Sequence, residues 1–208
     1  MIIFDFDGTL ADTISLGLHL INSHSEVFKY KKIDREKNEH LSALELIQYM
    51  GVKVWKLPYL MWYLRKKLGE KSAEIQMFPG IKELLESLKA SGYKLGILSS
   101  NSAKNITDFL KRNNIESYFS YIKPKVPIFG KKQALGKAKR QLKTSFVYVG
   151  DELRDVEACR KNNIPLVSVA WGLNSAASLE QANPNLVARD TNEAVALIKK
   201  AAGDFLKN

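Results

Sequence analysis

The sequence predicts an α/β protein with a doubly wound, Rossmann-like parallel sheet as its core and an all-α domain inserted after the first strand. Three short apolar runs, at residues 95–98, 146–149 and 166–170, alternate with amphipathic helical patterns. This alternation is typical of a parallel sheet covered on both faces. A further apolar run opens the chain, and residues 14–77 behind it are helical in pattern throughout. We therefore expect a core domain of residues 1–13 and 78–208 and an inserted helical domain of residues 14–77.

Each element follows from its local pattern. Residues 2–6 form the first strand, and Leu10–Thr13 then leads into a capped helix start. Pro79–Gly80 marks the return to the core. After this point, apolar residues at helical spacing predict four helices. The first carries Ile81, Leu84, Leu85 and Leu88 and is closed by Gly92, and the second carries Ile106, Phe109 and Leu110. The other two span residues 155–163 and 193–206. Within the inserted domain, the dense aromatics Trp55, Tyr59, Trp62 and Tyr63 are expected to form part of its core.

The composition argues against a disordered or a collagen-like protein. A chain of 208 residues that is 45% hydrophobic and 26% charged has an ordinary globular composition. The single cysteine, Cys159, cannot form an internal disulfide, and it lies on an apolar helix face typical of a core position. No basic region precedes the first apolar run, and no stretch has the roughly 18 apolar residues of a membrane span. We expect a cytoplasmic protein with no membrane partner.

The net charge of +10 is compatible with nucleic acid, an anionic surface or an acidic small substrate as partner. Its densest basic region, residues 123–143, has neither an RNA-binding aromatic signature nor zinc-finger or basic-zipper spacing. A solvated helix face explains this region without a partner. We therefore expect no specific nucleic-acid binding and a monomer or weak homodimer.

The opening stretch MIIFDFDGTLADT places Asp5 and Asp7 at the end of a buried strand. A hairpin turn at Asp7–Gly8 would need a second strand, but a helix follows. An EF-hand calcium loop is excluded, because aligning Gly8 with its required glycine puts Ile3 and Ile14 at ligand positions. This stretch alone leaves two interpretations: the two carboxylates cap local structure, or they bind a cation between them.

Polar clusters also follow two later strands, namely Ser99–Ser102 and the pair Asp151 and Asp155. Because ligands bind beyond the carboxyl ends of parallel strands, we expect all three clusters to converge there. Four carboxylates repel one another without a hard cation, and oxygen ligands suit Mg²⁺. The hydroxyl of Ser99 and the amides of Ser100 and Asn101 can line an anion-binding turn, and Lys131 or Lys132 can neutralise a phosphoryl group. Together these groups predict a phosphoryl-transfer site.

The motifs Asp5-Phe6-Asp7-Gly8-Thr9, Leu98-Ser99, a downstream lysine and Gly150-Asp151-x-x-x-Asp155 resemble the four motifs of the haloacid dehalogenase superfamily. The resemblance implies that Asp5 is the nucleophile and that Asp7 is the general acid and base. It implies that Asp5, the backbone carbonyl of Asp7 and Asp151 bind Mg²⁺, with Asp155 in support, and that Ser99 binds phosphoryl oxygens. Lys131 fits the third motif best, because Phe129-Gly130-Lys131 opens a helix, although Lys132 stays an alternative.

Asp7 favours phosphoryl chemistry, since a halide leaves without needing a proton. A helical insertion between the first two motifs resembles the type-one cap of phosphoglycolate phosphatase-like and β-phosphoglucomutase-like members. These resemblances imply a Mg²⁺-dependent phosphatase, a phosphoric monoester hydrolase acting on a small phosphorylated metabolite. A phosphomutase, or a basic module on the same fold that binds nucleic acid or protein without catalysis, remain the alternatives.

Overall fold

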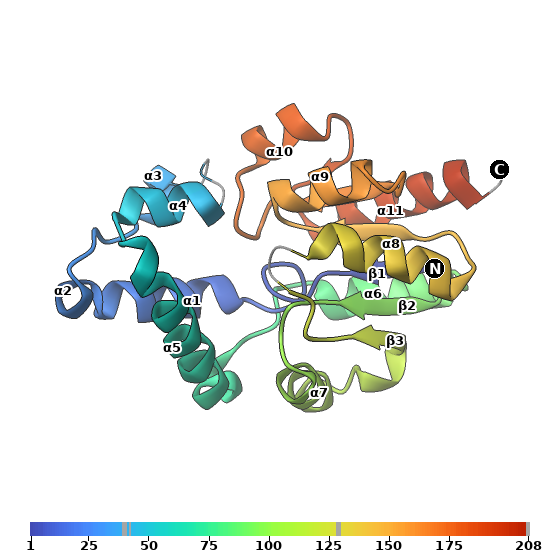
Figure 1. The fold of residues 1–208 in the computed structure, drawn as a ribbon. Helices are drawn as coiled ribbons and strands as arrows, with labels where there is room; N and C mark the ends of the chain where they lie inside the picture. Colours follow the sequence, from blue (N-terminus) through green and yellow to red (C-terminus); the bar gives the residue numbers. More distant parts are fainter. Residues whose placement is uncertain (39–40, 42, 128–129, 207–208) are drawn as a thin grey trace.

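The core is a six-stranded, all-parallel sheet in the order β3-β2-β1-β4-β5-β6 in the computed structural model, which describes residues 1–38, 41, 43–127 and 130–206 (Figure 1). The strands are β1 (Ile2–Phe4), β2 (Leu95–Leu98), β3 (Phe119–Lys123), β4 (Val147–Gly150), β5 (Leu166–Val169) and β6 (Val187–Ala188). The chain builds outward from β1 through β2 to β3, then returns to the other side of β1 and builds through β4 to β6. The predicted doubly wound sheet is confirmed, and its order reverses beside β1.

Helices cover both faces of this sheet. Alternate residues of each strand point to opposite faces, so the apolar side chains on both faces are buried under helices. On one face, Ile2 and Phe4 lie in one buried cluster with apolar residues of α6 (Ile81–Ala90), α7 (Ala103–Arg112) and α11 (Thr191–Leu206). On the other face, Ile3 and Tyr148 lie in a second cluster with residues of α8 (Lys131–Leu142) and α9 (Leu153–Arg160). The short helix α10 (Ala176–Ala182) precedes β6. Cys159 is buried in the second cluster, as predicted.

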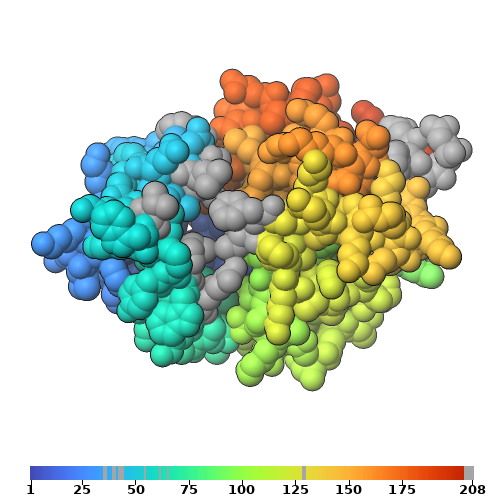
Figure 2. Space-filling model, in the orientation of Figure 1, coloured from blue at the N-terminus to red at the C-terminus, as the bar shows by residue number. Residues whose placement is uncertain are grey.

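Between β1 and α6 the chain forms a group of helices, here called the helical insertion. It consists of α1 (Thr13–Ser23), α2 (Ser25–Phe28), α3 (Arg35–Asn38), α4 (Ala43–Met50), α5 (Leu57–Glu70) and the 3-10 turns η1 (Val54–Lys56) and η2 (Ser72–Glu74). Asp12 caps α1, since its carboxylate accepts a hydrogen bond from the Ser15 amide. The insertion lies beyond the carboxyl ends of the strands (Figure 1), and Figure 2 shows it in blue to teal beside the core.

The insertion has its own buried cluster, but Trp55, Tyr59 and Trp62 are not among its residues. The cluster contains Leu20, Tyr30, Ile33, Leu46, Met50, Leu60 and Leu64. Trp55, Tyr59 and Trp62 are instead 71%, 54% and 54% exposed. The prediction that these three form the insertion's core is therefore wrong, because α5 turns Leu60 and Leu64 inward and leaves Tyr59 and Trp62 outside. Within the described part of the chain, no helix combines the length and apolarity needed to cross a bilayer.

Candidate active site

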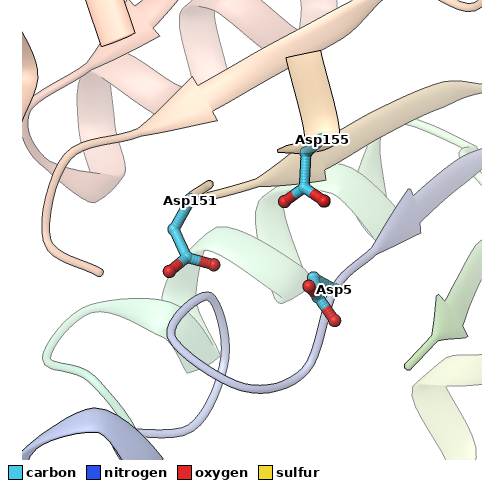
Figure 3. Close-up of side chains that lie close together, drawn as sticks. All are labelled: Asp5, Asp151 and Asp155. Carbon is cyan, nitrogen blue, oxygen red and sulfur yellow. The ribbon is translucent and has the colours of Figure 1, made fainter. Parts of the chain in front are cut away.

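The three predicted polar clusters do meet at the carboxyl edge of the sheet. Asp5 follows β1, Asp151 follows β4 and Asp155 lies in the first turn of α9, while Ser99 follows β2. Because β1 lies between β2 and β4, these positions are neighbours in space although they are far apart in sequence. The carboxylates of Asp5, Asp151 and Asp155 point toward a common space (Figure 3), with one oxygen of each within 4.8 Å of the others. All three are buried.

Lys131 connects two of these carboxylates. It is the first residue of α8, and its ammonium donates hydrogen bonds to Asp5 Oδ2 and Asp155 Oδ1. The same Nζ lies 5.6 Å from the centre of the buried Tyr148 ring. Lys132 is exposed, so only Lys131 of the two candidate lysines reaches the site. Phe129, which we used to place this helix start, lies outside the described residues.

The carboxylate of Asp151 is held on both oxygens. Thr9 Oγ1 donates to its Oδ1 at 2.9 Å, and the Leu173 amide donates to its Oδ2 at 2.8 Å. Two glycine backbones press against the same group, since a Cβ on Gly8 or on Gly172 would overlap the Asp151 carboxylate. Gly8 also has a φ of +75°, which disfavours any side chain there. The orientation of Asp151 is therefore fixed before any ligand arrives.

Asp7 is half-buried and is not one of the three clustered carboxylates. Its Oδ1 accepts a hydrogen bond from Asn101 Nδ2 at 2.9 Å, and its Oδ2 accepts one from Ser99 Oγ at 3.4 Å. The Asn101 amide in turn donates to Ser99 Oγ at 3.0 Å. The residues predicted to bind substrate thus contact the predicted acid and base directly. Ser100, the third of them, is half-buried between Ser99 and Asn101.

Burial and crowding of like charges disturb the acidity of the site. Burial raises the pKa of Asp151 well above its usual range, and the carboxylates of Glu152, Asp5 and Asp155 add to the effect. Burial likewise raises the pKa of Asp155 to about 6, although Lys131 opposes this. For Lys131, burial alone would lower the pKa, but Asp155 and Asp5 outweigh it and hold it well above its ordinary value. Burial and the charge of Asp5 raise the pKa of Asp7.

Three buried carboxylates converge on one space, and only Lys131 is seen to pair directly with two of them among the described residues. Lys131 is one cation among the buried carboxylates of Asp5, Asp151 and Asp155. A hard divalent cation between these oxygens would oppose both the burial and the like charges that raise the pKa of Asp151. The donor set is entirely carboxylate oxygen, which fits Mg²⁺ rather than the softer metals.

Three further contacts of this site were missed from the sequence. They are the hydroxyl of Thr9 and the amide of Leu173, both on Asp151, and the backbone of Gly172 against the same carboxylate. Trp171-Gly172 directly follows the apolar run at residues 166–170, and the sequence alone indicates no more than loop packing there. Trp171 does pack, with its ring 6.5 Å from that of Phe78, but its Nε1 also donates to the Thr9 carbonyl at 3.1 Å. The position directly after an apolar strand was the available signal.

Comparison with known proteins agrees with this geometry. The family model described as haloacid dehalogenase-like hydrolase matches residues 2–169. A phosphoglycolate phosphatase of Synechococcus elongatus is 37% identical over 190 residues, covering 88% of this chain and 90% of that protein. A pyrophosphatase of Oceanobacillus iheyensis is 24% identical, covering 95% of each chain. A crystal structure described as a predicted phosphatase from Clostridium acetobutylicum shares the fold, with a TM-score of 0.79, 23% identity and coverage of 96% and 97%. The chain belongs to the haloacid dehalogenase-like hydrolase family.

Proposed function

We propose that this protein is a Mg²⁺-dependent phosphatase that hydrolyses a small, phosphoglycolate-like phosphomonoester through an aspartyl-phosphate intermediate. The observation that supports it most is the pairing of buried Asp5 with Lys131 beside two further carboxylates that converge on one space. The 37% identical relative named phosphoglycolate phosphatase supports the substrate class.

In this proposal Asp5 attacks phosphorus. A bond forms between an Asp5 carboxylate oxygen and phosphorus as the bond from phosphorus to the leaving oxygen breaks. The Phe6 amide donates to Asp5 Oδ1 at 2.7 Å, and Lys131 binds Oδ2, so the carboxylate is held in one orientation. Lys131 also supplies positive charge next to the phosphoryl group as its negative charge moves.

Asp7 moves the proton. Its raised pKa favours a protonated carboxyl, which can donate to the oxygen of the departing alcohol. The resulting carboxylate then takes a proton from the water that attacks the phosphorus of the intermediate. Asn101 and Ser99 hold the side chain in place for both steps.

The metal-binding residues in this proposal are Asp5, Asp151 and Asp155, with the backbone carbonyl of Asp7. Mg²⁺ bound there supplies charge that offsets the phosphoryl oxygens and the three carboxylates. Thr9 and Leu173 already fix the two oxygens of Asp151. Lys131 keeps Asp155 in position from the other side.

Ser99, Ser100 and Asn101 are proposed to bind the phosphoryl oxygens, and the helical insertion is proposed to act as a cap that excludes water over the leaving group. A small anionic substrate also agrees with the net charge of +10. The domain boundaries at residues 13 and 78, the cytoplasmic location and the monomer or weak homodimer stay predictions.

A panel of phosphorylated compounds with Mg²⁺ tests the proposal, and it includes phosphoglycolate, inorganic pyrophosphate and a sugar phosphate. We expect release of inorganic phosphate, fastest from phosphoglycolate, none in excess chelator, and none with Ca²⁺ in place of Mg²⁺ because Ca²⁺ accepts looser coordination. Conversion of a sugar phosphate into its isomer without phosphate release would instead identify a mutase. No turnover of any compound would favour the non-catalytic binding module.

A further inference from the structure

A short segment that follows β5 in the sequence, Trp171–Asn174, contacts both the helical insertion and the predicted metal ligand Asp151. We call it the linking segment. The Leu173 amide donates to Asp151 Oδ2 at 2.8 Å, while the side chain of Leu173 packs against the buried cluster of the insertion. Leu173 therefore contacts the predicted metal ligand Asp151 through its backbone and the insertion through its side chain.

Asn174 makes the same connection with a single amide group. It is only 1% exposed, so its side chain depends on protein partners for its hydrogen bonds. Its Nδ2 donates to the carbonyl of Leu41 in the insertion at 3.0 Å. Its Oδ1 accepts from the Leu153 amide at the start of α9, the helix that carries Asp155, also at 3.0 Å. The Asn174 amide donates to the Asp151 carbonyl at 3.3 Å.

Further polar contacts between insertion and core, among the described residues, lie where the chain crosses between them. Arg112 Nη2 donates to the carbonyls of Ser72 and Ile75, and Ala11 pairs with Met77. Contacts at a crossing point hold the insertion at its base. Leu41 lies midway along the insertion, so its bond to Asn174 depends on how the insertion is placed against the core.

We propose that Asn174 is a positioning residue that couples the docking of the helical insertion to the metal ligands Asp151 and Asp155. When the insertion docks, its bond to Asn174 and its contact with Leu173 immobilise the linking segment, and that segment in turn holds Asp151 and the start of α9. Because such coupling is reciprocal, Mg²⁺ and the docked insertion stabilise each other to the same extent. The proposal rests on the proposed function only in taking Mg²⁺ as the ion.

Two substitutions separate the parts of this link. Asn174→Asp keeps an oxygen acceptor for the Leu153 amide but loses the donor to the Leu41 carbonyl. Its added negative charge would by itself strengthen Mg²⁺ binding, so weaker binding cannot be a charge effect. Leu173→Ala removes the packing against the insertion and keeps the amide bond to Asp151. Asn183→Ala is the matched control, since Asn183 donates to the Leu166 and Leu186 carbonyls away from the insertion.

The measurements are the Mg²⁺ dissociation constant by calorimetry and hydrogen exchange of the α4 amides, with and without Mg²⁺. Loss of one buried hydrogen bond corresponds to about a 2- to 12-fold effect. We expect Asn174→Asp and Leu173→Ala each to weaken Mg²⁺ binding by about that factor and to abolish the Mg²⁺-dependent protection of α4. Asn183→Ala should lower the melting temperature and leave both quantities unchanged.

Unchanged α4 exchange and unchanged Mg²⁺ affinity in Asn174→Asp would overturn the inference, as would equal effects in Asn183→Ala. Failure of the proposed function looks different. If the wild-type protein binds Mg²⁺ and α4 is protected in an Asn174-dependent way, but no phosphate ester is hydrolysed, the coupling stands and the phosphatase proposal fails.

Discussion

The sheet and the helical insertion use hydrophobic residues in opposite ways. Every residue of β1, β2, β4 and β5 is buried. The insertion instead leaves Trp55, Tyr59 and Trp62 more than half exposed, and Lys53 and Lys66 lie over the rings of Trp55 and Trp62. Central parallel strands are enclosed on both faces, so an apolar run there has one possible environment. A surface helix has an inner and an outer face, and an aromatic residue can lie on either.

The charged residues of the core and of the insertion also differ in how far they are buried. Buried charges of the core, such as Asp5, Asp155 and Lys131, are paired with one another at the edge of the sheet. Ion pairs within the insertion, such as that between Lys67 and Glu70, are solvent-exposed and are worth little. This difference between core and insertion predicts that single substitutions at the core site have large effects on turnover. Most substitutions on the surface of the insertion should have small effects.

The largest expected effect comes from Asp5→Asn. Without a nucleophilic oxygen no phosphoenzyme forms, so turnover falls by roughly 10⁴-fold or more. Asp7→Asn keeps the nucleophile and loses the proton carrier, which costs about 10²–10⁴-fold with an alkyl phosphate. With an activated aryl phosphate the first step should partly recover, and phosphate should accumulate on Asp5.

Mass spectrometry of the protein after rapid quenching distinguishes the two variants. Phosphate on Asp5 in Asp7→Asn supports the assigned roles. A phosphorylated Asp5→Asn protein would end the assignment of Asp5 as nucleophile, and equal losses in both variants with both substrates would reduce the pair to a shared electrostatic role.

The next effect sharpens the difference between buried and exposed lysine. Lys131→Met leaves Asp5 and Asp155 without their buried partner, which should lower the free energy of unfolding by about 3–5 kcal/mol. Lys132→Met, one residue along the same helix but exposed, should change it by less than about 0.5 kcal/mol. Urea unfolding of both variants without metal measures this. Similar losses in the two would contradict the placement of Lys131 in the site.

A third pair of variants tests the contrast inside the insertion. Leu60→Ala removes a residue that is 4% exposed and should lower the free energy of unfolding by about 2–5 kcal/mol. Trp62→Ala, on the outer face of the same helix, should cost less than about 1 kcal/mol despite the larger side chain. Chemical unfolding followed by circular dichroism gives both values. A larger loss for Trp62 than for Leu60 would restore the predicted aromatic core.

The smallest effect concerns metal and pH. Because burial raises the pKa values of Asp151 and Asp155 in the folded protein, their protonated forms favour folding. This contribution is complete below about pH 4, the pKa of an unfolded aspartate, and is lost as pH rises through about 6, the pKa of folded Asp155. The metal-free protein should therefore lose stability over this range.

Mg²⁺ should restore that loss, adding about 1–3 kcal/mol at concentrations 10–100 times its dissociation constant. We expect a clear rise in melting temperature with Mg²⁺ at pH 7.5 and little at pH 5, where protonation competes with the metal. The Asp151→Asn protein serves as the control and should respond weakly at both values. An equal Mg²⁺ effect in that variant would place the ion elsewhere.

The sequence predicted the four inner strands, since their apolar runs are continuous, and it predicted which polar residues meet, because parallel strands end at one edge. It missed β3, an edge strand whose Ser120 and Lys123 are exposed, and β6, which has only two residues. It could not choose between Lys131 and Lys132, because adjacent helix positions point about 100° apart and only packing orients the helix. Thr9, Gly172 and Asn174 act through tertiary contacts that no local pattern contains.

The strand order has a consequence for how the chain folds. β1 pairs with β2 and β4, so Ile2 lies between Leu95 and Val147, partners that follow it far along the sequence. During synthesis one edge of β1 stays unpaired until β2 is made at about half of the 208 residues, and the other until β4 is made at about 70%. Such long-range pairing slows folding and leaves strand edges open to aggregation. The position of Asp5 at the centre of the sheet thus requires that the strand carrying it pairs with partners made much later than itself.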